Sequence, residues 1–335
     1  MRNASPEPRF SLSACALALG LLAAAACGGA AGPLERLVIP EGASVRAVAD
    51  TLASHHIVRW PRLFELYVRL KDADAEIKAG TYDLPRGAGW SQALDALVAG
   101  RVVTVAVTIP EGWTVRRIAG RLATIAEISA DSATLRLLDP GLADSLGAPG
   151  PNLEGYLFPD TYRFAQGVSL EAIAAELLAH YRAVWTAERR AALDSLSMSE
   201  REIVTLASIV QSEARWADEM ALISAVFHNR LRRRMRLQAD PTVQYALESH
   251  QSRLLYRHID SVADHPYNTY THGGLPPGPI GSPGTAAIDA ALHPAAVPYL
   301  YFVAREDGRH EFSTSLGEHN RAVQRIRNSG AGTRE

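Results

Sequence analysis

The sequence has little cysteine. Both cysteines, Cys15 and Cys27, lie in the first 32 residues, and none follows them. The body of the protein therefore has no disulfide and no thiol nucleophile, so its stability must come from a hydrophobic core. A hydrophobic content of 47% over 335 residues is enough for one large domain or two smaller ones.

An excess of charge is also absent. The chain has 34 Lys and Arg against 36 Asp and Glu, a net charge of −2, so no basic field collects nucleic acid and we expect no such partner. No glycine-rich phosphate loop follows a strand. His258, His265 and His272 recur at a fixed spacing but lack an H-E-x-x-H motif or a cysteine partner. We therefore predict neither a metal nor a cofactor.

The amino-terminal segment is unlike the rest. Residues 10–32 contain no charged side chain, and this length matches the roughly 20 residues that span a bilayer. Because Arg2 and Arg9 precede it, we predict a cytoplasmic tail over residues 1–9, one transmembrane helix over 10–32, and a body on the far side of the membrane. Cleavage as a signal peptide, or lipidation at Cys27, remains an alternative for this small-residue-rich segment.

An internal repeat organises the first part of the body. Ile39-Pro40-Glu41-Gly42 recurs as Ile109-Pro110-Glu111-Gly112. In each copy a short apolar strand leads into the turn, Ser44 or Thr114 can cap, and a helix follows. Two copies are fewer than a solenoid needs. The pattern predicts an α+β protein with a small module over residues 33–107 and a mixed α+β domain over 108–330.

One predicted helix of the second domain has an acidic residue on the face that its pattern predicts to be buried. Ser199 and Glu202 form a capping box before an apolar run, which marks the helix start. Glu213 continues the predicted buried stripe of Ile203, Leu206, Ala207 and Val210. Burial and the negative end of the helix dipole both favour the protonated form, which suits a general acid. A glutamate that reaches solvent from the helix end is the alternative.

Two polar loop-type stretches follow this helix, at residues 235–247 and 267–284. Such side chains bind sugar hydroxyls, and aromatic faces stack on sugar rings. A long loop tract inside a compact domain is more often functional than idle. The predicted substrate contacts are Gln238, Asp240, Thr242, Tyr245, Tyr267, Asn268 and Thr269. The nearby run of Arg230, Arg232, Arg233, Arg234 and Arg236 is interpreted as a solvated helix face.

Five ordered motifs carry a family resemblance: NLEGYLFPDTY (152–162), ASIVQSEA (207–214), FHNRLRRRMRLQADPTVQYAL (227–247), YNTYTHGGLPPGPIGSPG (267–284) and HPAAVPYLYFVA (293–304). In this order they resemble the MltG or YceG-like family of bacterial endolytic murein transglycosylases. The resemblance implies a LysM-like module at 33–107, a catalytic domain at 108–330, and a single-pass inner-membrane protein with its body in the periplasm or outside. It also implies peptidoglycan strands as substrate and glycan-polymerising enzymes as partners.

The resemblance places the family's catalytic glutamate on Glu213. The acidic residue that the family has two positions earlier is Gln211 here, and the following Ser or Thr is Ala214. It implies cleavage between N-acetylmuramic acid and N-acetylglucosamine to give a 1,6-anhydro end. Two alternatives remain. One is a muramidase that uses Asp240, Glu154 or Asp160 as a second carboxylate, and the other is a peptidoglycan-binding protein without catalysis.

Overall fold

The computed structural model describes residues 32–249, 251 and 254–331 of the chain. The predicted tail, and the predicted anchor except for Gly32, lie outside the described residues. Within the described part, no helix is long and apolar enough to cross a membrane. Helices and small two-stranded sheets make up the fold, which confirms the mixed α+β class. The chain divides into two compact units: unit 1 runs to Val105 and includes Arg163–Gln166, and unit 2 comprises Ala106–Tyr162 and continues from Gly167.

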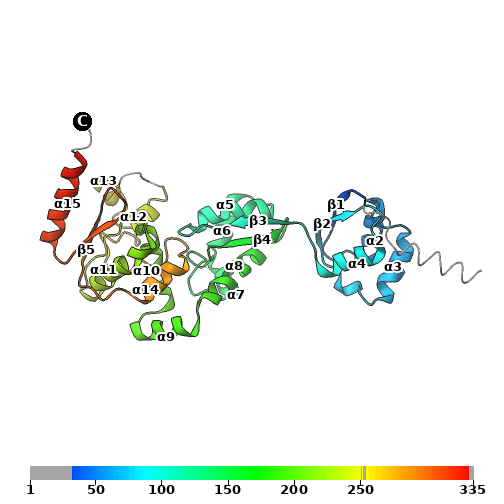
Figure 1. Cartoon of the computed structure of the whole chain (residues 1–335), viewed down its shortest axis with the longest axis horizontal. Coiled ribbons are helices and arrows are strands. Elements are labelled where there is room, and N and C mark those ends of the chain that lie inside the picture. The colour runs from blue at the N-terminus through cyan, green and yellow to red at the C-terminus, as the bar shows by residue number, and fades with distance from the viewer. Residues whose placement is uncertain (1–31, 250, 252–253, 332–335) are drawn as a thin grey trace, which may run out of the picture. The chain divides into compact units, whose positions relative to one another are not determined.

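Unit 1 is a small sheet with helices around its own core. Its elements are β1 (Leu34–Ile39), α2 (Val45–Ser54), α3 (Pro61–Leu70), the 3₁₀ turn η1 (Asp74–Glu76), β2 (Gly80–Pro85) and α4 (Trp90–Ala99) (Figure 1). β1 and β2 pair antiparallel, from Leu34 opposite Pro85 to Ile39 opposite Gly80. The Ser44 side chain accepts a hydrogen bond from the Ala47 amide, so the predicted cap of α2 is confirmed.

Unit 2 is largely helical. The second sheet consists of β3 (Thr104–Thr108) and β4 (Thr161–Ala165), each of which has residues in both units. The third sheet, of β5 (Tyr301–Ala304) and β6 (His310–Ser313), belongs to unit 2. The helical elements are α5 (Val115–Ala126), α6 (Ala130–Leu137), α7 (Pro140–Leu146), α8 (Leu170–Val184), α9 (Ala187–Leu196), α10 (Glu200–Glu213), η2 (Ala217–Glu219), α11 (Met220–Arg232), α12 (Asp240–Ala246), α13 (Tyr256–Ser261), α14 (Thr285–Leu292) and α15 (Leu316–Ala331).

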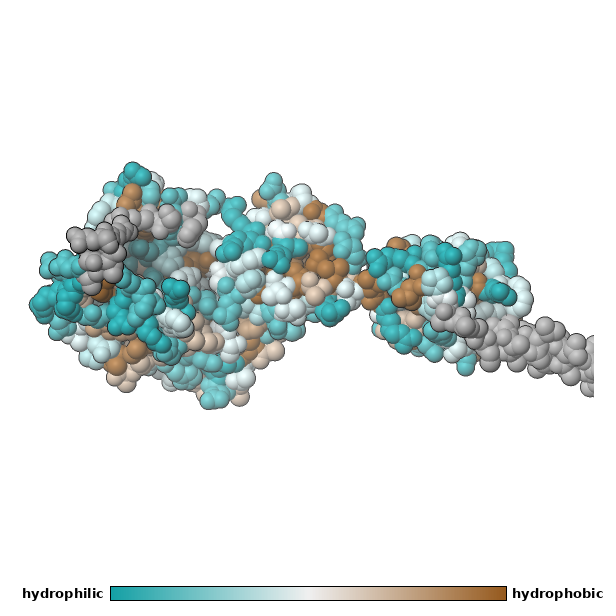
Figure 2. All heavy atoms as spheres, turned by 45° about the horizontal axis from the view of Figure 1, so that its top comes forward, coloured by the Kyte–Doolittle hydropathy of each residue, from teal (hydrophilic) through white to brown (hydrophobic). Residues whose placement is uncertain are grey.

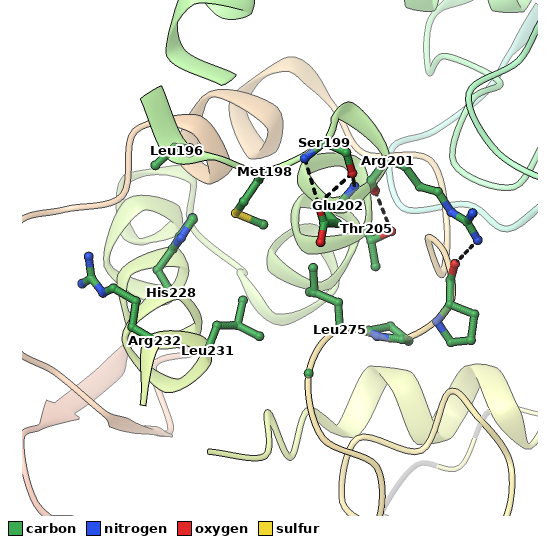
Figure 3. A pocket seen from close by; sticks show the side chains of 13 residues that line it. Leu196, Met198, Ser199, Arg201, Glu202, Thr205, His228, Leu231, Arg232 and Leu275 are labelled. Carbon is green, nitrogen blue, oxygen red and sulfur yellow. Dashed lines mark hydrogen bonds between the residues drawn. The ribbon is translucent and has the colours of Figure 1, made fainter. Parts of the chain in front are cut away.

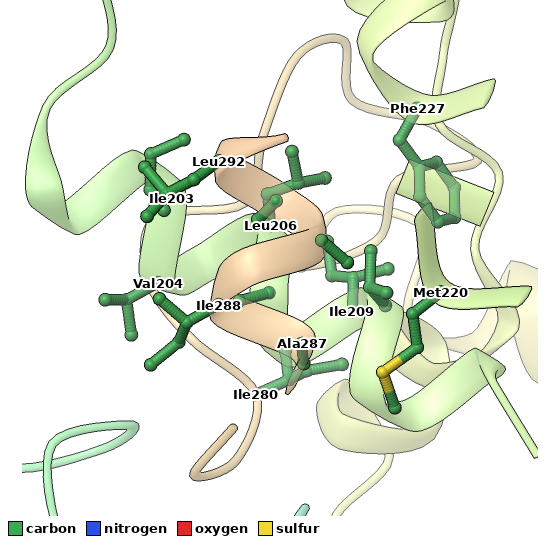
Figure 4. Close-up of a cluster of buried hydrophobic side chains, with 14 of the residues drawn as sticks. Ile203, Val204, Leu206, Ile209, Met220, Phe227, Ile280, Ala287, Ile288 and Leu292 are labelled. Atoms are coloured by element: carbon green, nitrogen blue, oxygen red, sulfur yellow. The ribbon is translucent and has the colours of Figure 1, made fainter. Parts of the chain in front are cut away.

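Helix α10 lies in the core of unit 2. It packs against α11 and α14, and Figure 4 shows Ile203 and Leu206 of α10 beside Ile288 of α14 in one buried cluster. The predicted capping box is confirmed, because the Ser199 hydroxyl accepts from the Glu202 amide while the Glu202 carboxylate accepts from the Ser199 amide. Outside such clusters the surface is mostly hydrophilic, with brown apolar patches on both units (Figure 2). A well-capped, core-packed helix therefore fixes the position of its last residue, Glu213.

Candidate functional site

Glu213 ends the buried stripe of α10. The stripe residues before it are fully buried, whereas Glu213 is half-buried. Within the described part of the chain, its carboxyl group has no hydrogen-bond or ion-pair partner. Burial and, less strongly, the negative charge of Asp240 together raise the pKa of Glu213 to about 8, although Arg230 opposes both. Glu213 is therefore protonated at neutral pH and still open enough to meet a substrate.

Arg230 lies behind this acid, on α11. The side chain is 9% exposed, and its guanidinium donates to the carbonyls of Leu237 and Leu300, both at 2.7 Å. It also sits 5.1 Å from the centre of the Tyr301 ring. The prediction of a solvated arginine face is therefore wrong for Arg230, because this side of α11 packs inward. The other four arginines of the run are exposed, but α11 ends at Arg232, so the predicted helix face holds for that residue alone among them.

An Asp–Tyr pair adjoins Glu213 from the loop side. The Tyr270 hydroxyl donates to Oδ1 of Asp240, the first residue of α12, at 2.5 Å. Burial, this hydrogen bond and the charges of Asp240 and Glu213 raise the pKa of Tyr270, so the phenol keeps its proton. Asp240 is exposed. The sequence prediction includes Tyr267, Asn268 and Thr269 but not Tyr270. Tyr270 could have been included, because it is another tyrosine of the same motif.

Three of the predicted contact residues are enclosed by protein. Thr242 donates its hydroxyl to the Ala239 carbonyl at 2.7 Å, and the Thr269 hydroxyl accepts from the Ala239 amide at 3.0 Å. The Asn268 amide group donates to the carbonyls of Ile259 and Val262. All three side chains are almost fully buried. They hold α12 against the 267–271 loop, so direct contact with a substrate stays a prediction for them.

The remaining predicted contacts are more accessible. Gln238 is exposed and adopts a left-handed backbone conformation with φ 48°. A hydrogen bond from its backbone amide to the Thr269 carbonyl holds this conformation. Tyr245 and Tyr267 are half-buried, and their ring centres lie 4.8 Å apart at 37°. These aromatic faces form a small platform in the same loop region as Asp240.

Glu154 is another acid of unit 2 with a raised pKa. It is 3% exposed, and its oxygens accept from the Val115 amide at 3.0 and 3.2 Å and from the Tyr245 hydroxyl at 3.2 Å. Burial raises the pKa of Glu154 to about 8, against these hydrogen bonds. Thr114 makes no side-chain cap bond at the start of α5, so the predicted Thr114 cap is wrong. The Glu154 carboxyl group takes that place instead.

The second copy of the repeat docks beside the end of α10. The Gly112 amide donates to the Ser282 carbonyl at 2.7 Å, and the Ser282 amide donates to the Trp113 carbonyl at 2.9 Å. The side-chain oxygen of Gln211 accepts from the Gly284 amide at 3.0 Å. Gln211 therefore ties the 281–284 loop to the helix that carries Glu213, which gives this position a structural use.

A sequence model of the YceG-like family matches residues 37–325. The chain belongs to the YceG-like family. An endolytic murein transglycosylase of Bacillus subtilis (strain 168) is 33% identical over 303 residues, which cover 86% of this chain and 83% of that protein. One of Streptococcus pneumoniae serotype 2 is 30% identical over 321 residues, 87% of this chain and 58% of that protein. A 2.6 Å crystal structure of a YceG-like protein from Listeria monocytogenes aligns with a TM-score of 0.60 at 33% identity, covering 86% of this chain and 99% of that one.

In this YceG-like protein the loop after Glu213 is clamped to the β5–β6 hairpin. Glu219 and His310 have side chains 8% and 6% exposed, and they meet at 2.9 Å between Oε2 and Nδ1. The His310 amide also donates to both carboxylate oxygens. Arg309 bonds Asp218 at 3.0 Å and lies over the Trp216 ring. The path of the chain just beyond the acid is therefore fixed from the hairpin.

A pocket of about 720 Å³ lies at the other end of α10 (Figure 3). Ser199, Arg201 and Glu202 line it from the helix start, while His228 and Arg232 face them from α11. Because α10 rises about 1.5 Å per residue, its first turn lies about 20 Å from Glu213. This pocket is thus separate from the acid. Within the described residues, no three His, Cys, Asp or Glu side chains gather as a metal site requires.

Proposed function

We propose that this chain cleaves within peptidoglycan glycan strands as an endolytic murein transglycosylase. The chain is a lytic transglycosylase by its family, and relatives at 33% and 30% identity bear that name. One observation supports Glu213 as the catalytic residue. It is a half-buried acid at the end of a well-capped helix, and it keeps its proton to about pH 8.

The proposed reaction uses one carboxyl group twice. Glu213 donates its proton to the oxygen that joins N-acetylmuramic acid to N-acetylglucosamine, and the bond from C1 to that oxygen breaks. The Glu213 carboxylate then takes the proton of the muramyl C6 hydroxyl, whose oxygen attacks C1. The products are a 1,6-anhydromuramyl end and a free sugar hydroxyl, with no water consumed. Arg230 stabilises the carboxylate between the two proton transfers because it attracts that charge.

The second candidate is a muramidase, which needs another carboxylate to activate water or form a covalent bond. Asp240 is the observation in its favour, since its charge acts on Glu213. However, Asp240 already accepts a hydrogen bond from the Tyr270 hydroxyl, which occupies one of its oxygens. The Glu154 side chain is buried and its oxygens already accept from Val115 and Tyr245, which disfavours it as a base for a water nucleophile. These contacts favour the internal C6 nucleophile.

We assign the predicted contact residues two kinds of role. Gln238, Asp240, Tyr245 and Tyr267 are proposed to touch the glycan, because they are exposed or half-buried. Thr242, Asn268 and Thr269 are proposed as positioning residues that hold this loop. Residues 33–107 are proposed as a LysM-like glycan-holding module, and residues 10–32 as the inner-membrane anchor that places the body in the periplasm. Glycan-polymerising enzymes are the proposed protein partners.

The deciding experiment compares the full chain with its Glu213→Gln variant on purified peptidoglycan, with mass spectrometry of the new sugar ends. Glu306→Gln, which removes an exposed acid, is the matched control. We expect anhydromuramyl ends from the wild type and the control and none from Glu213→Gln. Reducing ends would instead establish the muramidase, and no cleavage by the folded wild type would point to a binding protein.

A further inference from the structure

Helix α3 of unit 1 exposes an apolar stripe. Trp60, just before the helix, is 52% exposed, and Leu63, Leu66 and Leu70 are 41%, 52% and 76% exposed. Steps of three, three and four residues place them along one face of a helix. Its other apolar face, with Phe64, is fully buried in the core of unit 1. The exposed stripe is therefore not needed to bury the helix.

The backbone at the start of this stripe is strained. Trp60 has φ 56° and ψ 70°, a left-handed conformation that is rare for a bulky residue. Two features over-determine it. Pro61 fixes the first turn of α3, and the Trp90 indole donates to the Arg59 carbonyl at 3.2 Å. The fold thus accepts a cost while the Trp60 indole stays at the surface.

The stripe begins at the end of unit 1 where the described chain begins. The Gly32 amide donates to the Arg86 carbonyl at 3.1 Å, and the Arg86 amide donates to the Pro33 carbonyl at 3.0 Å. The neighbouring Gly87 amide donates to the His56 carbonyl at 2.8 Å, in the loop that leads to Trp60. Gly32, the last residue of the uncharged 10–32 run, is therefore tied by the 86–87 turn to the loop that precedes α3.

Two arginines stand at this end beside acids that are already paired, Glu35 with Arg86 and Glu65 with Arg69. Arg59 and Arg62 are exposed, and among the described residues neither has an ion-pair partner. Leu34, two residues after Gly32, is 68% exposed. Tryptophan, leucines and unpaired arginines on one surface are the composition of segments that lie in the headgroup layer of anionic membranes.

The geometry points to a lipid-binding surface: the stripe of Trp60, Leu63, Leu66 and Leu70 lies in the headgroup layer of the membrane that the 10–32 run crosses. Arg59 and Arg62 contact anionic headgroups beside it. The surface fixes which side of unit 1 faces the bilayer. This inference rests on the run being a membrane anchor and is independent of the catalytic assignment.

The test uses the full chain with Cys15→Ser and Cys27→Ser, an environment-sensitive fluorophore on Leu66→Cys, and vesicles of phosphatidylethanolamine with phosphatidylglycerol. Gln92→Cys, on the exposed side of α4, is the matched control. We expect a blue shift and quenching by lipids brominated near the headgroup for the label at residue 66 only. Leu63→Ser with Leu70→Ser should reduce that quenching without changing the circular dichroism spectrum, because both side chains are exposed.

Three results would overturn the inference. The first is protein that does not float with the vesicles. The second is a label at residue 66 that is no more quenched than the one at residue 92. The third is a blue shift without lipid quenching, which would mean that protein covers the stripe, either the amino-terminal run or a second copy.

Discussion

Glu213 and Glu154 have similarly raised pKa values but are suited to different tasks. Burial raises the pKa of each to about 8. Glu154 spends its oxygens on Val115 and Tyr245, so its carboxyl group holds three segments together. Glu213 has no such partner within the described residues and is half-buried. Only an acid of the second kind can pass its proton to a substrate and take one back.

The pH dependence of activity follows from Glu213. In the proposed mechanism the protonated acid is the active form, so kcat/KM should fall as pH rises through about 8. Removing the positive charge in Arg230→Gln should move this fall to higher pH, while Arg230→Lys should leave it near its wild-type position. The rate of anhydromuramyl-end formation, measured on folded protein across pH, checks both. A fall that does not move in Arg230→Gln would contradict the assignment.

The same proton should affect stability. In the unfolded chain Glu213 loses its proton near pH 4.5, whereas in the folded protein it keeps it to about pH 8. Between these values the folded state binds the extra proton, so stability falls as pH rises. Glu213→Gln lacks this loss, and its stability relative to the wild type should grow from pH 5 to pH 8. Urea unfolding at several pH values measures it, and a constant difference would argue against the raised pKa.

Local pattern predicts some of these residues and not others. The capping box of Ser199 and Glu202 and the stripe that ends at Glu213 follow from spacing along one helix. The burial of Arg230 does not, because it depends on the segment around Leu300 folding back over α11. The bond from Tyr270 to Asp240 likewise joins a loop to the start of α12, and tertiary packing sets where these two meet.

At the scale of elements, the hairpin clamp should be essential for stability. His310→Ala removes the side-chain partner of a buried carboxylate that keeps its bonds to the backbone amide of residue 310, which should cost about 1–3 kcal/mol. Arg305→Gln breaks an exposed pair with Asp307 on the same hairpin and should cost much less, because solvent screens that pair. Denaturant unfolding measures both. Equal losses would mean that the Glu219–His310 pair contributes no more than a surface pair.

The repeat shows one sequence motif in two settings. A Cβ on Gly42 of the first copy would meet no atom within 4 Å, whereas the second copy docks on the 281–284 loop. Periodicity predicts both strand–turn–helix units. It does not predict that the turn of the second copy packs against the 281–284 loop. That contact joins residues 112 and 282, which are far apart in the chain.

Tight packing in this dock makes a glycine sensitive to substitution. A Cβ on Gly281 would lie 2.8 Å from the Gly112 carbonyl oxygen, which is backbone and cannot turn aside. Gly281→Ala should therefore cost about 1–3 kcal/mol and lower kcat through the displaced end of α10. Gly273→Ala, where no atom lies within 4 Å, should change neither. Unfolding curves and turnover of the two variants, measured together, test the dock.

At the scale of the whole molecule, each unit has a hydrophobic core of its own. Phe64 and Tyr82 are fully buried in unit 1, and Ile209 and Phe227 are buried in the cluster around α10 in unit 2. Composition and the repeat predict a small module before a larger domain. The inclusion of residues 163–166 in unit 1 is not predictable from local pattern, because it requires β4 to pair with the distant β3.

Separate cores should unfold as separate cooperative units. Calorimetry of the full chain should therefore resolve two transitions. Phe64→Ala should destabilise unit 1 by about 3–5 kcal/mol and lower the transition temperature of that unit alone. Phe227→Ala should destabilise unit 2 by a similar amount and lower only the transition temperature of unit 2. Because the Glu213 cluster lies in unit 2, only Phe227→Ala should also reduce the temperature at which cleavage of peptidoglycan is lost. One transition that both substitutions shift equally would show that the two cores unfold together.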